Sequence, residues 1–285
     1  MANLLFLTPE IPAACTNYKT YTTSTAITPN ESDFRPFKNC LRGEKYQHYY
    51  SGYASSEHCA VYDCGIASAV PITKSANFVV LSRLDIMAAV ASFSIGAATM
   101  NFFLQSSSDD STYTTRHSIT GVSTASLIGP WSNDYVSLFT ATSAFRYWRQ
   151  RWVKATGSDF TLKIGKVYFG TSLDIGKDPR YQIRRLQPGQ TALITDGGNK
   201  YSARIKHPTY EINLNYEGLT DAQLQAFKDG VVKNRSNTPV FLYTQSFHEP
   251  TDNKQLILCN LVEWETTHRR YNWNTLTCRF IESVG

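Results

Sequence analysis

Three arginines lie close together on one aromatic stretch of the chain. Arg146, Arg149 and Arg151 alternate with aromatic side chains between Phe145 and Trp152. A guanidinium group is a planar fork that binds a carboxylate through two parallel hydrogen bonds. The pattern therefore predicts a contact surface, with these three arginines at a subunit interface. The alternative is that their aliphatic stems only cover a sheet.

Two other groups of side chains could hold a metal ion. Cys59 and Cys64, with His58 beside them, offer zinc ligands, but no second pair with zinc-like spacing follows. Asp109 and Asp110 lie on a Ser-rich turn, where calcium could take oxygen ligands. Buried thiols and an acidic hairpin tip are the alternatives. We expect no metal and no other cofactor.

The sequence carries no motif of a catalytic site. No G-x-S-x-G segment marks a nucleophile, and the six histidines are scattered. Residues 196–199, Asp-Gly-Gly-Asn, have the character of a hairpin turn and not of a phosphate-binding loop. We therefore expect a protein without enzymatic activity.

Composition points to a mainly β protein. The 285 residues are 42% hydrophobic and 18% charged, and they include 17 Tyr, 15 Phe and 5 Trp, which suit a half-buried pleated surface. The longest apolar stretch, residues 86–98, is too short to cross a bilayer, so no stable membrane insertion is expected. No secretory signal opens the chain, and we expect its six cysteines to be reduced.

The net charge of +5 raises the question of nucleic-acid binding, because arginine interleaved with Trp and Tyr is a feature of nucleic-acid grooves. No zinc finger, RNP signature or helix-turn-helix pattern accompanies these residues. Nucleic acid is therefore not an expected partner.

Three parts follow one another along the chain. Residues 1–34 are rich in Thr, Ser, Asn and Pro and predict an extended arm, either free or held by a neighbouring subunit. Residues 35–172 show short strands between polar turns, as in a jelly-roll β-sandwich. Residues 173–285 predict a smaller β-rich domain. Its one helix, at about 221–233, begins with a capping box of Thr220 and Gln223.

The strand motifs resemble two kinds of known proteins. The aromatic strand at 145–152, the segment Lys163 to Gly170 and the turn at 104–113 resemble a discoidin-like (galactose-binding-like) domain. Combined with the helix start at 219–222, the strand at 238–243 and the end at 278–282, they resemble structural proteins of the distal tail or tail tip of tailed bacteriophages.

The resemblance implies a non-enzymatic component of a bacteriophage virion. Such a protein lies at the tail end or baseplate, connects the tail to tip or fibre proteins, and forms a homo-oligomeric ring of three- or six-fold order. It would be made in the cytoplasm of the bacterial host. The alternative is a lectin-like module that binds a carbohydrate of the host surface, although the alanine-rich stretch at 86–98 offers no polar sugar-binding loop.

Overall fold

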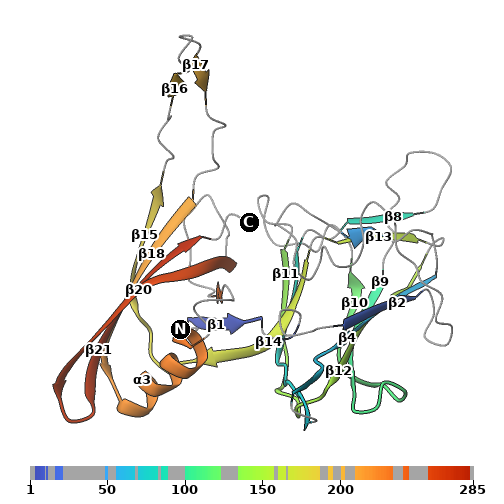
Figure 1. Ribbon diagram of the computed structural model, residues 1–285, viewed down its shortest axis with the longest axis horizontal. Helices are drawn as coiled ribbons and strands as arrows, with labels where there is room; N and C mark the ends of the chain where they lie inside the picture. The colour runs from blue at the N-terminus through green and yellow to red at the C-terminus, as the bar shows by residue number, and fades with distance from the viewer. Residues whose placement is uncertain are drawn as a thin grey trace. The chain divides into compact units, whose positions relative to one another are not determined.

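Strands form nearly all of the regular structure (Figure 1). The computed structural model describes residues 4–9, 11, 17–21, 49–50, 56–67, 70–82, 85–88, 100–122, 134–156, 160–164, 166–186, 192–194, 200–202, 209–233, 240–243 and 256–282. The predicted mainly β class, with a β-sandwich and one short helix, is confirmed. No helix in these ranges is long and apolar enough to cross a membrane.

The chain divides into two compact units. The sandwich unit comprises Leu7–Ser172, Phe247–Gln255 and Gly285, and the C-terminal unit comprises Met1–Phe6, Leu173–Ser246 and Leu256–Val284. The predicted division of the chain stays a prediction, with an arm at 1–34 and domains at 35–172 and 173–285. Most of the arm lies outside the described residues.

Two main sheets build the sandwich unit. The larger has the order β10 (Thr114–Val122), β9 (Met100–Ser107), β12 (Tyr147–Lys154), β4 (Glu57–Asp63) and β2 (Asn17–Tyr21). The other contains β11 (Asp134–Leu138), β7 (Phe78–Ser82) and β14 (Lys166–Asp174). Smaller sheets join β3 (Tyr49–Tyr50), β13 (Phe160–Ile164) and β8 (Asp85–Ala88), and join β5 (Ile66–Ala67) to β6 (Val70–Pro71).

An aromatic core joins these two main sheets. The ring of Phe169 on β14 lies 5.1 Å from that of Tyr62 and 5.7 Å from that of Trp148, centroid to centroid. Val79, Leu81 and Val167 complete the second layer of the same buried cluster. Alternation along each strand places one set of side chains in this core and the other set on the outer face of the five-stranded sheet.

The segment from Lys163 to Gly170, predicted to be one strand, belongs to two. Lys163 and Ile164 end β13, which pairs with β8 and β3, whereas Lys166 begins β14, which pairs with β7. The alternation of charged and apolar residues is the same in both strands, so it did not reveal the change of sheet. The aromatic strand was predicted correctly and is β12.

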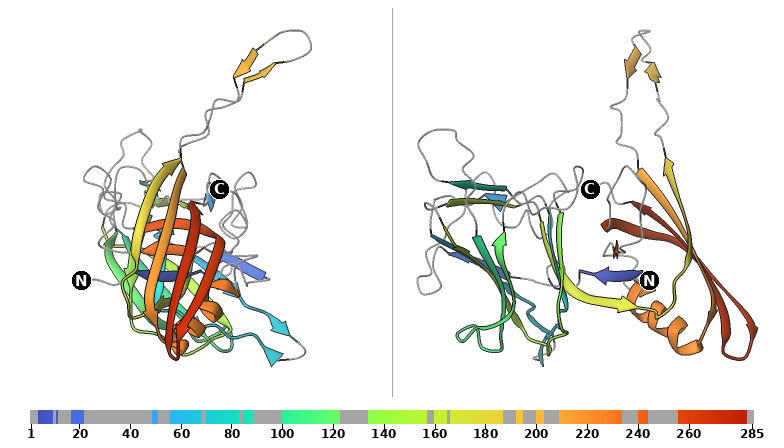
Figure 2. Two further views of the ribbon diagram at one scale, coloured as in Figure 1. Left: turned by 90° about the vertical axis from the view of Figure 1, so that its left-hand side faces the viewer. Right: turned by 180° about the vertical axis from the view of Figure 1, so that it is seen from behind.

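The C-terminal unit holds a sheet covered on one face by a helix. Its strand order is β1 (Leu5–Thr8, through Leu5 and Phe6), β19 (Val240–Tyr243), β20 (Leu256–Arg270), β21 (Trp273–Glu282), β18 (Thr209–Leu219) and β15 (Arg180–Leu186). Figure 2 shows β20, β21, β18 and β15 as long neighbouring strands. The predicted alternation in β18 is confirmed, because Ile212, Leu214 and Tyr216 are buried.

Helix α3 (Asp221–Phe227) begins at the predicted capping box. The Thr220 hydroxyl accepts from the Gln223 N–H, and the Gln223 side chain accepts from the Thr220 N–H. The helix continues as a π-helical turn (Lys228–Val232) and not as the α-helix expected to 233. Phe227 packs against Phe6 with ring centroids 5.6 Å apart, and Phe6 contacts Phe280 of the sheet at 6.0 Å.

Strands β15 and β18 continue toward a second pair of strands. β16 (Ala192–Ile194) pairs with β17 (Lys200–Ser202), and this pairing follows the β15–β18 register with a shift of one residue. The predicted turn at 196–199 lies outside the described residues, between these strands. β15 and β18 are thus the base of a long hairpin.

Candidate functional site

Alternation in β12 separates its tryptophans from its arginines. Trp148 and Trp152 are fully buried in the sandwich core. Arg149 lies opposite Val61 of β4 and Gln105 of β9, and Arg151 lies opposite Cys59 and Phe103. Directly paired residues point to the same side of a sheet, so these six side chains share the outer face.

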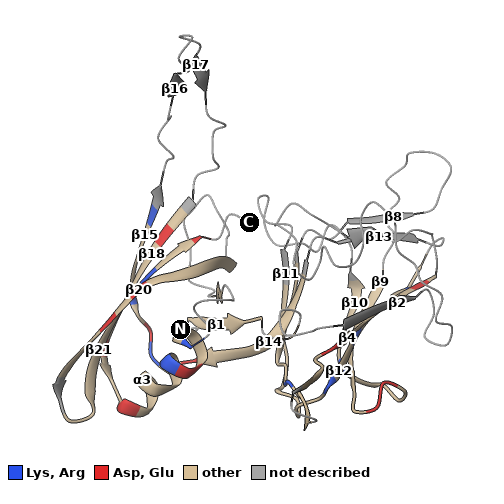
Figure 3. Ribbon diagram, in the orientation of Figure 1, with Lys and Arg blue, Asp and Glu red and all other residues tan. Residues whose placement is uncertain are grey.

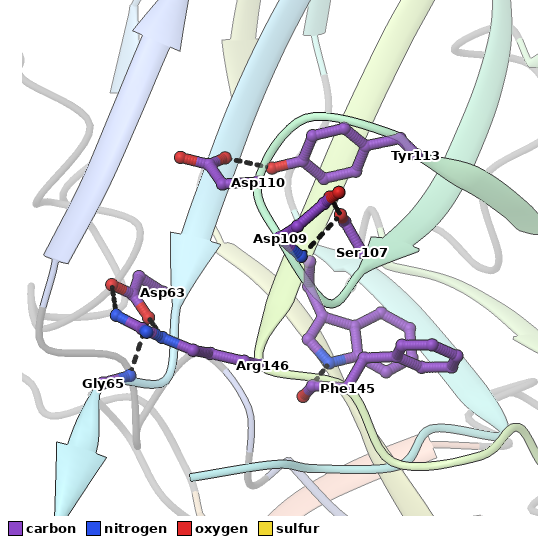
Figure 4. A network of polar contacts seen from close by, with 9 residues as sticks. Asp63, Gly65, Ser107, Asp109, Asp110, Tyr113, Phe145 and Arg146 are labelled. Carbon is purple, nitrogen blue, oxygen red and sulfur yellow. Dashed lines mark hydrogen bonds and ion pairs between the residues drawn. The ribbon is translucent and has the colours of Figure 1, made fainter. Parts of the chain in front are cut away.

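Two of the three predicted arginines are held by carboxylates of the same unit. Arg146 donates from Nε and Nη2 to Asp63 at 2.8 and 3.0 Å (Figure 4). Arg151 donates from Nε and Nη2 to Glu57 at 2.9 and 3.1 Å. Burial pushes the pKa of Glu57 upward, but the hydrogen bonds from Arg151 and Cys59 outweigh it, so the pKa lies below its ordinary value.

Arg149 has a different environment. It is 8% exposed, and its Nε donates to the side-chain oxygen of Gln105 at 2.8 Å. Its guanidinium carbon lies 4.0 Å from the ring centroid of Tyr113. Gln105 is itself oriented by a hydrogen bond from its amide nitrogen to the Thr115 hydroxyl at 3.0 Å. The guanidinium is therefore fixed by a neutral amide and an aromatic ring.

The turn between β9 and β10 positions Tyr113. One oxygen of Asp109 accepts from the Ser107 hydroxyl at 2.7 Å and from the Ser111 and Thr112 N–H groups at 3.0 and 3.1 Å. These hydrogen bonds lower the pKa of Asp109. The Tyr113 hydroxyl donates to Asp110, which has a positive φ of 60° (Figure 4). The turn is thus ordered by its own side chains.

The two groups weighed as metal ligands do not converge. His58 and Cys59 are consecutive on β4 and point to opposite faces, and Cys64 belongs to the core cluster whereas Cys59 lies outside it. Burial raises the pKa of the Cys59 thiol. Asp109 is occupied by donors of its own turn. In the described ranges, no three His, Cys, Asp or Glu side chains gather as metal ligands.

The remaining described cysteines are also buried. Cys64, Cys259 and Cys278 have exposures of at most 1%, and none of the four described cysteines forms a disulfide. Cys15 and Cys40 lie outside the described residues.

Open strand edges form a second surface, on the C-terminal unit. β15 ends its sheet, so its outer edge has no described neighbour. β19 pairs only with residues 256–259 of β20, so residues 260–270 of β20 pair with β21 alone in the described part of the chain. One sheet therefore has an open edge on either side of β18 and β21.

These two edges differ in charge. A row across the polar face runs from Arg180 on β15 through Asn215 and Thr277 to Glu265 on β20. The next row ends at Glu263 on β20, and Arg184 lies further along β15. Arg180, Arg184, Glu263 and Glu265 are all exposed. Figure 3 colours Lys and Arg blue and Asp and Glu red along the ribbon. The β15 edge thus carries two exposed arginines, and the β20 edge carries two exposed glutamates, followed by Arg269 and Arg270 at the end of the strand. Within the chain, Arg180 lies 3.9 Å from Glu217, and Glu263 lies 4.0 Å from Arg279.

Sequence reasoning found the arginines but missed their partners. Glu57 is the first residue of β4 and Asp63 the last, and Gln105 lies in β9. All three are far from β12 in the sequence. The carboxylates at both ends of an apolar strand were the one available signal.

The comparisons with known proteins found similar solved structures but no similar sequence. No protein-family model matches the chain, and no curated protein matches it. Chitosan-binding module 2 of a chitosanase/glucanase from Paenibacillus sp. IK-5, solved with chitotriose, is similar at 15% identity and a TM-score of 0.39, over 56% of this chain and 99% of the module. The module CBM32-1 of a family 31 glycoside hydrolase from Clostridium perfringens is similar at 12% identity and a TM-score of 0.35, over 57% and 96%.

A pectin-binding carbohydrate-binding module is similar at 12% identity and a TM-score of 0.36, over 55% of this chain and 91% of the module. Likeness at this level carries no information on what this chain binds.

Proposed function

We propose that this chain is a non-enzymatic structural protein that joins copies of itself into a closed ring through the edges of its C-terminal sheet. The observation that carries the proposal is the pair of open edges, one with the exposed Arg180 and Arg184 and the other with the exposed Glu263 and Glu265. An open edge offers unpaired N–H and C=O groups to another strand. The edge with arginines on one copy and the edge with glutamates on the next form a head-to-tail contact, which closes into a ring when the rotation allows.

Charge complementarity makes this contact selective. Arg180 and Arg184 on one copy would face Glu263 and Glu265 on its neighbour, whereas two β15 edges would repel each other. The sequence resemblance supports a location of such a ring at the tail end of a bacteriophage virion, next to tail-tube, hub or fibre proteins. That location and these partners belong to the proposal.

Charge reversal tests the ring. We expect the full chain to sediment as a ring of three- or six-fold order, and Arg180→Glu with Arg184→Glu to shift it to monomers. Glu263→Arg with Glu265→Arg should do the same, and all four changes together should restore the ring. Lys233→Glu, an exposed change at the end of the π-helical turn, is the matched control. A parent chain that stays monomeric, or rings that tolerate both single-edge reversals, would contradict the proposal.

The virion assignment needs its own test. Purified particles should contain the chain at a constant multiple of three or six per tail, measured by quantitative mass spectrometry. If the chain is absent from particles, the proposed role in the tail is wrong. The proposed pairing of strand edges is then tested by sedimentation alone.

Carbohydrate binding by the sandwich unit is the second candidate. The turn at 107–113 favours it, because Asp109 fixes the backbone of Ser111 and Thr112, whose exposed side chains carry hydroxyl groups near Tyr113. A turn whose backbone is already ordered loses less entropy when its hydroxyl groups bind a hydroxyl-rich ligand. A glycan array probed with the full chain tests this candidate, with Asp109→Ala expected to weaken any signal and Asp229→Ala, an exposed change, to leave it intact. An array without signal would exclude it for the sugars displayed.

A further inference from the structure

The three arginines differ in how their charge is compensated. Arg146 and Arg151 each bind a carboxylate through two hydrogen bonds. None of the described carboxylates lies within ion-pair distance of Arg149. Arg149 is nevertheless the most buried, at 8% exposed, whereas the side chains of Arg146 and Arg151 are 20% and 28% exposed. The most deeply buried guanidinium is therefore the one without a directly bound carboxylate.

Glu57 attracts Arg149 electrostatically but makes no hydrogen bond or ion pair with it. Burial of a charge without a directly bound anion is costly, since a longer-range attraction replaces the lost hydration only in part. Gln105 takes one of the five N–H donors of Arg149, through Nε. The Nη groups have no hydrogen-bond partner among the described residues, and neither nitrogen is fully sealed from solvent. The guanidinium thus presents a free fork toward the surface.

The neighbouring carboxylates are already engaged. Glu57 accepts from Arg151 and from the Cys59 thiol. Asp63 accepts from Arg146 and from the Gly65 N–H, and Asp110 accepts from Tyr113. Moving any of them to Arg149 would break an existing hydrogen bond.

We propose that Arg149 is a binding site for an external carboxylate, held by the two Nη groups beside the ring of Tyr113. A carboxylate matches the planar fork of arginine and accepts two parallel hydrogen bonds. The side chain is already oriented by Gln105 and Tyr113, so binding costs little rotamer entropy. The carboxylate comes either from a small acid, such as a sugar acid, or from Asp or Glu of a second copy. The site does not depend on the ring proposed above.

Acetate is the probe, used on the full chain. Nuclear magnetic resonance of the arginine Nε–Hε groups is followed during titration with sodium acetate, with sodium chloride at equal ionic strength as the reference. We expect a saturable shift at Arg149 and none at Arg146 or Arg151. Arg149→Lys keeps the charge but loses the fork, and should weaken acetate binding about tenfold, followed at the Tyr113 N–H. Arg151→Lys is the matched control and should leave acetate binding unchanged.

Gln105→Glu gives an independent readout. It places a carboxylate at the atom that already accepts from Arg149, so it should abolish acetate binding and raise the midpoint of urea unfolding. Binding that survives Gln105→Glu would overturn the proposal, as would a parent chain whose shifts with acetate equal those with chloride. If Arg149→Lys fails to fold, Gln105→Glu alone decides.

Sedimentation separates the two sources of the carboxylate. If a second copy supplies it, acetate and Gln105→Glu should both shift the chain to smaller species. If a small acid supplies it, the oligomeric state stays constant while acetate still binds. The ring proposal is tested by reversal of the edge charges, so either proposal can fail without the other.

Discussion

Arg149 stacks on Tyr113 with its guanidinium carbon 4.0 Å from the centre of the ring, so the two side chains form one unit on the outer face of the five-stranded sheet. They reach this contact from different elements, Arg149 from β12 and Tyr113 from the turn that precedes β10. The aromatic ring offsets part of the cost of burying a charge, because its face is electron-rich.

Replacing the ring should therefore destabilise the sandwich unit more than removing the hydroxyl. Tyr113→Leu removes the cation–π contact, and we expect it to cost about 1–2 kcal/mol of unfolding free energy. Tyr113→Phe keeps the ring and loses only the hydrogen bond to Asp110, so a loss of about 1 kcal/mol or less is expected. Urea unfolding measures both, and equal losses would show that the ring contributes nothing.

The ion pair between Glu57 and Arg151 should make stability depend on acidity. Burial opposes ionisation of Glu57, but Arg151 and Cys59 hold its pKa below the ordinary 4.5. A carboxyl group with a lowered folded pKa stabilises the fold above its unfolded pKa, and this contribution is lost as the pH falls from about 4.5 through the lower folded value. We expect Glu57→Gln to cost about 2 kcal/mol at pH 7 and to flatten the loss of stability below pH 4.5.

The control for this experiment is Asp178→Asn, which changes an exposed carboxylate in the turn between β14 and β15. Unfolding free energies measured from pH 7 to pH 3 should fall in parallel for this control and for the parent chain. A Glu57→Gln variant with the same pH slope as the parent would show that Glu57 is not responsible.

A buried glutamine weakens the core of the sandwich. Gln150 is 1% exposed between Ala60 and Leu104, and neither its Oε1 nor its Nε2 has a hydrogen-bond partner among the described residues. Gln150→Met keeps the length of the side chain and removes both unpaired polar atoms. We expect a gain of about 1 kcal/mol in urea unfolding, whereas exposed Gln182→Met should change nothing. A loss of stability would mean that a partner satisfies the amide.

Local sequence patterns predicted local structure well. The capping box at Thr220 and the alternation in β18 and β12 follow from the geometry of one helix or strand. The roles of the arginines could not be read in this way, because Asp63 lies 83 residues from Arg146 and Glu57 lies 94 residues from Arg151. Their pairing depends on β4 lying beside β12, which is a property of the whole sheet. The sequence therefore predicted the same role for all three arginines. In the structure, only Arg149 has no carboxylate bound directly to it.

Gly218 shows how tightly the end of β18 is packed. It has a φ of +70°, and an added Cβ would lie 2.8 Å from Lys177 Nζ and 3.0 Å from Cζ2 of Trp273. Lys177 also donates to the Gly218 carbonyl at 3.0 Å. Gly218→Ala should therefore cost about 2–3 kcal/mol, as the sum of backbone strain and a displaced lysine contact.

Gly121→Ala separates these two contributions. Gly121 has a similar φ of +67°, but an added Cβ there would meet nothing within 4 Å, so only the backbone strain of about 1 kcal/mol applies. Urea unfolding of both variants gives the contact contribution as the difference between their losses. Lys177 Nζ ends a flexible side chain that can move aside, so the difference reports chiefly the contact with the Trp273 ring and the lost Lys177 hydrogen bond, and we expect it to be about 1 kcal/mol. Equal losses would mean that Lys177 and Trp273 move aside without cost.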